Sequence, residues 1–506
     1  MGVIGQSIGA GGVQLRRAGA SDDELFRRAT EAWAAGNAES FLPELERALP
    51  ASGDYRLWHI HGLILRQLER REDALPSLRR AVELNPKAEK PAHALARTLY
   101  EAGLPCIDAY GHAMQLAPAN EAILGELADA FVGAGEVHTA ISGLEKIVAR
   151  SPLWVAGHLK LAQLRWMEGE REGFTRSFSD ALRQHPRVLD LWREQILSLI
   201  HAEQWDEGLR IIGEGRAVLG DQPLFAINEA VIHAERGETE LADALFLPFL
   251  AVDDASLQVR IVRHHLRAGR PEQAAAIIEQ WLGRPDALMF YPYASIAWRL
   301  TDPPRWHWLE GDDRFVGVYD IADRLPPLDA LAATLRGLHK LSGQPLEQSL
   351  RGGTQTDGDI FMQVDPLLVR LREAVRMTVA EHVARLPPTD PAHPLLSGRR
   401  DKILFNGAWS VRLRGAGFHS NHVHPLGWFS SALYIALPPD IGVGDAGVLT
   451  LGEPRSSCFE IDMPPFRTIE PRPGRLVLFP SYMWHGTRPF GEGERLTVAF
   501  DVARLP

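Results

Sequence analysis

The first part of the chain carries a helical pattern of apolar and polar positions that returns at a fixed distance. Its clearest copy is LWHIHGLILRQLERREDALPSLRRAVELNP, residues 57–86, which places Trp58, Gly62, Ala74, Ala81 and Pro86 at regular offsets. Small residues such as Gly62 and Ala74 allow two antiparallel helices to approach closely, and Pro86 ends the second helix. The pattern therefore predicts a helix pair as the repeating unit.

Further copies follow along the chain. The one after the first is two residues shorter than a 34-residue unit, and the fourth has Phe174 where a small residue is usual, which predicts looser local packing. Weaker copies continue to about Trp281. The marker residues of the second, third and fourth copies are Ala94, Cys106, Ala113, Pro118; Ala128, Ala140, Ile147, Pro152; and Ala162, Phe174, Ala181, Pro186.

Residues 21–300 therefore resemble a tetratricopeptide-repeat solenoid, because endings of the Ala…Pro type recur at or near the 34-residue spacing. Such stacks bury a continuous core between neighbouring repeats and leave a concave groove open. The resemblance implies that this groove binds a peptide or protein segment. A helical stack that serves only as a spacer or a dimerisation surface is the alternative.

The repeating pattern stops at about Asp302. Prolines punctuate residues 301–340, which we expect to be a connector, and the Gly-rich segment 349–359 predicts a loop. An amphipathic helix is predicted over 366–386, with its apolar face formed by Leu368, Leu371, Val375 and Val379.

Beyond this helix the pattern changes to short β-strands rich in branched and aromatic residues. Because no helices intervene, a small barrel or jelly roll is favoured over a parallel sheet. A multidomain chain is predicted, with an all-α solenoid followed by a mainly-β domain with flanking helices. The strands are expected at 403–413, 428–437, 447–451, 474–480 and 495–502.

Charge and composition limit the kinds of partner and the cellular location that can be expected. The net charge of −11 argues against a general nucleic-acid binder, and no apolar run is long enough to span a bilayer. Residues 1–20 lack the apolar core of a secretory signal and are expected to form a flexible leader, so a cytoplasmic protein is predicted. The two cysteines, Cys106 and Cys458, have no metal-binding or disulfide spacing and are expected to be small buried hydrophobes.

Candidate metal ligands cluster in FHSNHVHPLGW, which contains His419, His422 and His424. Residues two apart in a strand point to the same face, so His422 and His424 could bind one ion. This signal alone is weak, since the composition predicts about 0.7 His-x-His pairs by chance.

The C-terminal segment strengthens the metal interpretation. A predicted strand ends at Pro480, His485 follows after a turn, and Arg495 and Thr497 come later in RLT. This arrangement resembles the distal half of an iron(II)/2-oxoglutarate oxygenase. The resemblance covers about 341–506 and extends to bacterial members with HxHP, SLRGGTQT and FPS…H segments, here 422–425, 349–356 and 479–485.

The resemblance implies a double-stranded β-helix, with Fe(II) as the metal and 2-oxoglutarate as cosubstrate. His422, His424 and His485 would be the metal ligands. Arg495 would bind the far carboxylate of 2-oxoglutarate in bidentate fashion, with Thr497 as a second contact. The Gly-Gly segment 349–356 is interpreted either as a lid or substrate loop or as a structural turn.

The chain departs from the wider superfamily at one ligand. Non-haem iron oxygenases usually present two histidines and one carboxylate, and the carboxylate normally falls where His424 stands. Three interpretations remain open: a three-histidine site, which we favour; a site in which His424 turns away; or a carboxylate from elsewhere, such as Asp445 or Asp462. A cavity lined by Trp409, Trp428, Trp484 and Phe490 is a further possibility.

The leading hypothesis is an Fe(II)/2-oxoglutarate-dependent dioxygenase that hydroxylates a protein or peptide held by the repeats. The vertebrate aspartyl/asparaginyl β-hydroxylases resemble this plan, as an analogy of architecture. One alternative is a cupin-like three-histidine dioxygenase that does not use 2-oxoglutarate. The other is a non-catalytic repeat scaffold with a degenerate oxygenase domain.

Overall fold

The computed structural model describes residues 21–346, 348–439, 441–442, 444–454, 459, 461 and 463–505. The chain forms two compact units, Met1–Leu99 and Tyr100–Pro506. The expected leader 1–20, Cys458 and Asp462 lie outside the described residues. None of the described helices combines the length and the apolar character needed to cross a bilayer.

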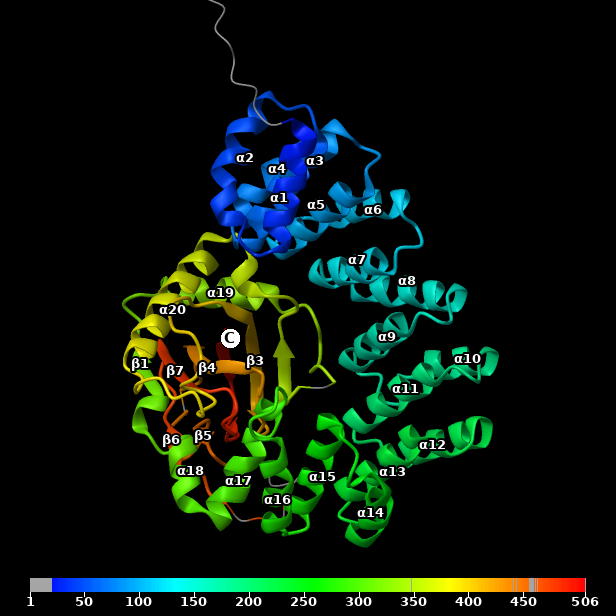
Figure 1. Cartoon of the computed structure of the whole chain (residues 1–506), viewed down its shortest axis with the longest axis vertical. Helices are drawn as coiled ribbons and strands as arrows, with labels where there is room; N and C mark the ends of the chain where they lie inside the picture. Colours follow the sequence, from blue (N-terminus) through cyan, green and yellow to red (C-terminus); the bar gives the residue numbers. More distant parts are fainter. Residues whose placement is uncertain are drawn as a thin grey trace, which may run out of the picture. The chain divides into compact units, whose positions relative to one another are not determined.

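The first unit is helical (Figure 1). The close helix approach predicted from the sequence is confirmed, because a Cβ on Gly62 would lie 2.6 Å from the Leu78 side chain, and Ala74 is fully buried. Ser21 caps the first helix by accepting from the Glu24 amide at 3.3 Å. The elements are α1 Asp22–Ala34, η1 Ala38–Phe41, α2 Leu42–Ala48, η2 Leu49–Ala51, α3 Tyr55–Gln67, α4 Arg71–Leu84 and α5 Glu89–Glu101, the last of which crosses the unit boundary.

The second unit begins with helix pairs that continue the repeat pattern (Figure 1). Phe174, expected to loosen its repeat, is fully buried beside Trp166, with ring centroids 5.2 Å apart. The helices are α6 Ile107–Leu116, α7 Glu121–Gly133, α8 Val137–Arg150, α9 Val155–Met167, α10 Arg176–Gln184, α11 Leu189–His201, α12 Trp205–Leu219, α13 Pro223–Glu235, α14 Thr239–Phe246, η3 Leu247–Phe249, α15 Ala255–Arg267, α16 Pro271–Trp281, η4 Ala287–Met289, α17 Tyr291–Thr301 and α18 Pro303–Glu310.

Two antiparallel sheets follow. The larger has the order β1-β7-β4-β9-β3-β2 and the smaller β6-β5-β8. The elements are η5 Asp313–Phe315, β1 Gly317–Asp320, α19 Leu328–Leu338, β2 Leu350–Gln355, η6 Ile360–Met362, α20 Pro366–Ala384, β3 Phe405–His419, β4 Gly427–Ala436, β5 Leu449–Leu451, β6 Arg467–Ile469, β7 Arg475–Pro480, β8 His485–Thr487 and β9 Glu494–Ala503.

Buried residues of both sheets pack together, among them Tyr434 and Phe479 from the larger sheet and Leu449 from the smaller. Helix α20 buries the predicted face, since Leu368, Leu371, Val375 and Val379 are all fully buried. The predicted solenoid followed by a mainly-β domain with flanking helices is confirmed.

The segment 301–340, expected to be a connector, also contributes to the larger sheet. Its strand β1 pairs with β7, with Tyr319 opposite Leu476. The last helix pair shares the core of the β domain as well: the Tyr482 hydroxyl donates to the Leu309 carbonyl and the Trp484 indole donates to the Pro292 carbonyl, both at 2.8 Å.

The prediction of a loop over 349–359 was wrong, because residues 350–355 form the edge strand β2. The glycines are needed for pairing with β3. Gly352 has φ +76° at a bulge, and a Cβ on Gly353 would lie 2.3 Å from the Arg412 carbonyl oxygen. The Gly-Gly pair therefore belongs to a close strand approach rather than to a free loop.

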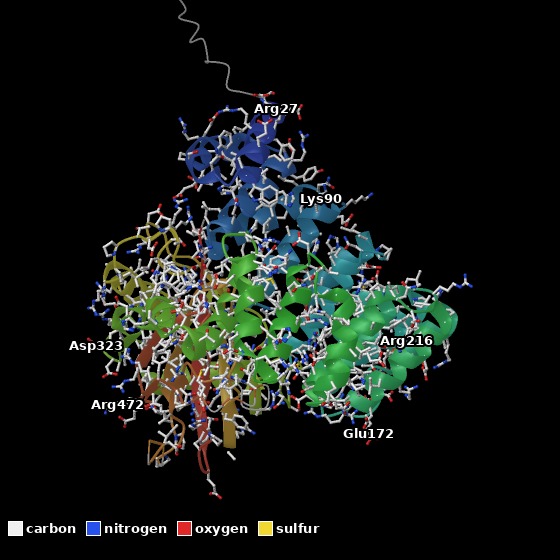
Figure 2. The ribbon with its side chains drawn as sticks, turned by 60° about the horizontal axis from the view of Figure 1, so that its bottom comes forward. Arg27, Lys90, Glu172, Arg216, Asp323 and Arg472 are labelled. Atoms are coloured by element: carbon white, nitrogen blue, oxygen red, sulfur yellow. The ribbon has the colours of Figure 1, made fainter. Side chains whose placement is uncertain are left out.

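Charges of both signs lie on the surface. Asp323 and Arg472 are both exposed at the outer edge of the β domain (Figure 2). The described cysteine, Cys106, is buried, and burial raises the pKa of its thiol to about 11, as expected for an inert packing residue.

Candidate active site

The three histidines proposed from the sequence converge. One ligand atom of each of His422, His424 and His485 lies within 4.8 Å of the others. His422 and His424 were expected to share a strand, but they lie in the link between β3 and β4. His485 begins β8. Backbone bonds bring them together, because the amides and carbonyls of His422 and His485 pair at 2.9 and 3.0 Å and the His424 amide donates to the Ser481 carbonyl at 2.8 Å.

The orientation of each ring leaves the same nitrogen available. Each Nδ1 faces an oxygen that only accepts hydrogen bonds. Nδ1 therefore carries the proton, and Nε2 is the unprotonated ligand atom. The acceptors are the Ser420 carbonyl for His422 at 2.9 Å, the Asp501 carboxylate for His424 at 2.7 Å and the Met483 carbonyl for His485 at 2.9 Å.

Electrostatics also favour neutral rings. Burial lowers the pKa of His485 to about 3, and it lowers the pKa of His422 well below its usual range, with neighbouring histidines adding to both effects. Neutral imidazole is the form that binds metal ions. Three such nitrogens with room beside them suit a divalent transition metal that keeps open positions.

His419, the remaining histidine of the cluster, lies beside the triad rather than in it. Its Nδ1 is 3.1 Å from the Ser349 hydroxyl, which is also 3.2 Å from Nε2 of His422. Burial and the charge of Arg495 lower the pKa of His419 to about 3. Ser349, in the Gly-rich segment, thus links β2 to the site.

Asp501 is the residue that the sequence reasoning missed. Its carboxylate contacts His424 and also accepts from the Ser430 hydroxyl at 2.7 Å. A signal was present, because Arg495, Thr497 and Asp501 alternate along β9 and line one cavity. Of the carboxylates considered earlier, Asp445 does not line this cavity, and Asp462 lies outside the described residues.

Arg495 lines the same cavity as the three histidines. Its guanidinium is buried, donates to the Gly447 carbonyl at 3.1 Å and lies 5.1 Å from the Tyr434 ring centroid. Its Nε has no hydrogen-bond partner, and no carboxylate within the described part of the chain pairs with it. Thr497 lines the cavity beside it. A buried cation without a counter-charge fits a ligand carboxylate, as 2-oxoglutarate would supply.

Only one of the four aromatic residues suggested for the cavity lines it. Trp409 borders both the metal cavity and the groove outside it. The indole of Trp428 donates to the Leu395 carbonyl at 2.9 Å, and that of Trp484 points to α17. Phe490 packs in a small separate cluster with Leu350.

A groove of about 950 Å³ leads from the histidines to the helical repeats. His422, His424 and Asp501 line one part of it, and residues of α11, α12, α13 and α15 line another. The segment before β2 attaches to the repeats, because Leu346 is buried among them and the Ser342 amide donates to Glu168 at 3.2 Å. The two parts of the second unit therefore enclose one continuous space.

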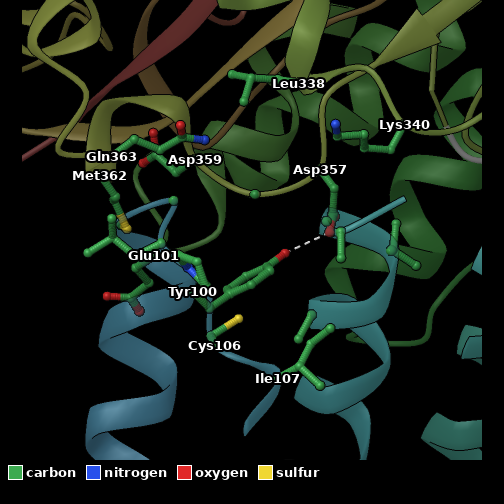
Figure 3. Close-up of a pocket in the computed structure, with 18 of the residues that line it drawn as sticks. Tyr100, Glu101, Cys106, Ile107, Leu338, Lys340, Asp357, Asp359, Met362 and Gln363 are labelled. Atoms are coloured by element: carbon green, nitrogen blue, oxygen red, sulfur yellow. Dashed lines mark hydrogen bonds between the residues drawn. The ribbon is translucent and has the colours of Figure 1, made fainter. Parts of the chain in front are cut away.

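A second cavity, of about 570 Å³, lies where the segment 338–363 meets α6 and α7 (Figure 3). The Tyr100 hydroxyl donates to Asp357 at 2.6 Å there, and Cys106 and Lys340 also line the space. Gln355 borders this cavity and the metal cavity alike.

A family model matches part of the β domain. The family model described as "Putative 2OG-Fe(II) oxygenase" matches residues 407–501, which contain all five site residues predicted from the sequence. A search of curated proteins found no match.

Among solved structures the chain is similar to a tetratricopeptide repeat protein from Parabacteroides merdae (18% identity, 47% of this chain, 96% of that chain, TM-score 0.30). It is also similar to yeast Tom70 (14% identity, 57% of this chain, 62% of that chain, TM-score 0.36). A third similar structure is a prolyl-4-hydroxylase from Pseudomonas putida (17% identity, 38% of this chain, 94% of that chain, TM-score 0.26). The chain joins a helical region with a tetratricopeptide-like repeat in its sequence to a C-terminal domain whose residues 407–501 match the 2-oxoglutarate/iron(II) oxygenase family model.

Proposed function

We propose that this protein is an Fe(II)/2-oxoglutarate-dependent dioxygenase that hydroxylates a peptide or protein segment held in the groove beside the repeats. The observation that carries the proposal is one cavity lined both by His422, His424 and His485, whose ligand atoms converge, and by the buried guanidinium of Arg495, which has no carboxylate partner among the described residues. A cavity that offers both metal ligands and a buried cation suits a ligand that chelates metal with one end and presents a carboxylate at the other.

When bound, iron and 2-oxoglutarate would together supply the oxidising power, which no side chain of the chain can provide. The residues of the chain position these groups. The three histidines would hold the metal, and Arg495 and Thr497 would orient the far carboxylate. Asp501 would fix the Nδ1–H tautomer of His424 and so orient its Nε2 towards the metal.

Water exclusion is the second contribution of the chain. The cavity wall contains Val411, Leu449 and Phe479, which are buried and apolar. An apolar lining lowers the local dielectric and so strengthens the attraction between Arg495 and a carboxylate. It also limits side reactions of the oxidising centre with solvent.

A polypeptide substrate is supported by the groove. Its wall includes four helices of the repeat region and also the metal-binding histidines, so a segment lying along the repeats would pass the metal.

The test is to add iron(II) and then 2-oxoglutarate to metal-free protein under nitrogen and to record the visible spectrum and the binding stoichiometry. We expect a charge-transfer band that needs both additions and that is lost in His485→Ala and weakened in Arg495→Ala. Arg472→Ala, an exposed arginine of the same domain, should behave as wild type. Iron binding without a response to 2-oxoglutarate would favour a three-histidine dioxygenase of another kind. No iron binding by folded protein would leave a repeat scaffold.

A further inference from the structure

Helix α15 presents three arginines on one face. Arg260, Arg263 and Arg267 are spaced by three and four residues, which places them in a row along the helix. Glu235 of α13 faces this row and accepts from Arg263 at 2.8 Å and from Arg267 at 2.5 Å.

Arg260 is the member of the row without a carboxylate. Its Nη1 donates to the side-chain oxygen of Asn228 at 3.1 Å, and no acidic group of the described chain lies within ion-pairing distance. The side chain is half-buried, and burial and the like charge of Arg263 lower the pKa of its guanidinium more than the more distant Asp254 raises it. A partly desolvated guanidinium that bonds only to a neutral amide is poorly compensated, so a carboxylate from a ligand would bind it favourably.

The other charges along the groove are paired. The Arg351 guanidinium lies 3.9 Å from Glu203, and Asp501 is bonded to His424. Arg260 is therefore the charge that distinguishes this groove, and it borders the same space as the proposed metal ligands.

The wall of the groove around Arg260 is built from equivalent positions of successive repeats. Leu197, Val231 and Arg263 each stand eight residues after the first residue of their helices, Leu189, Pro223 and Ala255, and all three line the groove. Equivalent positions of three successive repeats thus form one wall, which suits an extended chain more than a compact molecule. Apolar surface is offered as well, since Leu426, two residues after His424, lines the groove and is 67% exposed.

We propose that the groove selects an acidic peptide segment, whose Asp or Glu side chain pairs with Arg260 while another residue of the same segment reaches the histidine site. The second half of this statement rests on the proposed function; the pairing with Arg260 does not. The acidic side chain binds Arg260 at a distance from the residue that reacts. The repeats therefore determine which substrates bind.

The probe is a set of short fluorescein-labelled peptide pools, each with one position held as Glu, Gln, Lys or phosphoserine and the others randomised. Binding to the full chain is followed by fluorescence anisotropy. We expect the best Glu pool to bind about tenfold or more tightly than its Gln counterpart. Arg260→Gln should abolish this preference, Arg260→Lys should retain part of it, and Arg210→Gln on α12, whose guanidinium pairs with Glu207 and Glu214, should leave it unchanged.

A measurement on the wild-type protein keeps the test independent of how the variants fold. Raising the salt concentration should weaken binding of the Glu pool and leave the Gln pool almost unaffected, because salt screens the charge pair. Equal affinity of the two pools, a salt response common to both, or a phosphoserine or Lys pool that binds best would each overturn the proposal.

The outcome is separable from that of the proposed function. A charge-transfer band without any Glu preference would retain the oxygenase and reject the acidic anchor. A Glu preference that depends on Arg260, in a protein that binds no iron, would retain the anchor and reject the oxygenase.

Discussion

The Asp501 carboxylate lies 2.7 Å from Nδ1 of His424, and its other oxygen accepts from the Ser430 hydroxyl at 2.7 Å. The carboxylate is therefore held from two sides, and it dictates which nitrogen of His424 is protonated. Among the three histidines, His424 is the one oriented by a charged group, while the rings of His422 and His485 are oriented by backbone carbonyls. This arrangement places a negative charge beside His424, where the resemblance to non-haem iron oxygenases implies a carboxylate ligand.

Asp501→Asn should weaken iron(II) binding by about 10- to 100-fold, since removal of a carboxylate behind a metal-bound histidine has effects of that size. The amide has the same volume, so the fold should persist. Anaerobic titration with iron(II) measures the affinity, and Asp445→Asn, an exposed carboxylate outside the cavity, is the matched control. Unchanged affinity would show that Asp501 does not support a metal ligand.

Arg495→Lys should weaken 2-oxoglutarate binding by roughly 30-fold or more, because Lys keeps the charge but loses the bidentate fork. Thr497→Val should cost less, up to about tenfold, since it removes at most one hydrogen bond. Iron(II) affinity should be unchanged in both variants. Calorimetry of 2-oxoglutarate binding to the metal-loaded protein checks this order, and an equal loss in the two variants would contradict it.

His382 should make the β domain less stable in acid. Its ring packs against Phe429, its Nδ1 lies 2.9 Å from the Tyr319 hydroxyl, and burial lowers the pKa from 6.5 to about 4. The unfolded chain then binds more protons between these values, so the contribution of His382 is present above pH 6.5 and is lost as the pH falls towards 4. The loss amounts to about 2 kcal/mol at about pH 5.

Thermal unfolding of wild type and His382→Gln at about pH 7 and about pH 5 measures the pH-dependent contribution of His382 to stability. The variant cannot titrate, so its midpoint should fall less than that of wild type between the two conditions. His307→Gln, at an exposed histidine, should retain the full wild-type fall. An identical pH response in all three proteins would exclude a role for His382.

Gly353→Ala should destabilise the edge of the larger sheet, because the added Cβ would lie 2.3 Å from the Arg412 carbonyl oxygen and 3.0 Å from the Leu413 Cα. Backbone atoms cannot move as a flexible side chain can, so we expect a loss of about 1–3 kcal/mol. Gly337→Ala, within α19 and with nothing within 4 Å of its Cβ, should be neutral or slightly stabilising. Urea unfolding of the two variants compares them, and equal stability would refute the close approach.

Much of the fold follows from local sequence. Gly62 and Ala74 mark a close helix pair because only small side chains fit there, and the face of α20 follows from its period. The strands around Phe429 and Val498 were located because branched and aromatic residues between turns favour extended backbone. The edge strand β2 was missed, since glycine has no preference for a strand. Glycine is needed in β2 only because β3 approaches it closely, which the sequence does not show.

The sequence by itself determined the candidate site residues: His422, His424 and His485 as metal ligands, and Arg495 and Thr497 as contacts for a carboxylate. Only the tertiary structure decided that the three ligand nitrogens converge, that Asp501 stands behind His424, and that Arg260 borders the same groove. The physical reason is distance along the chain. Periodicity reports on neighbours within a helix or strand, whereas these contacts join segments whose approach depends on the packing of the whole second unit.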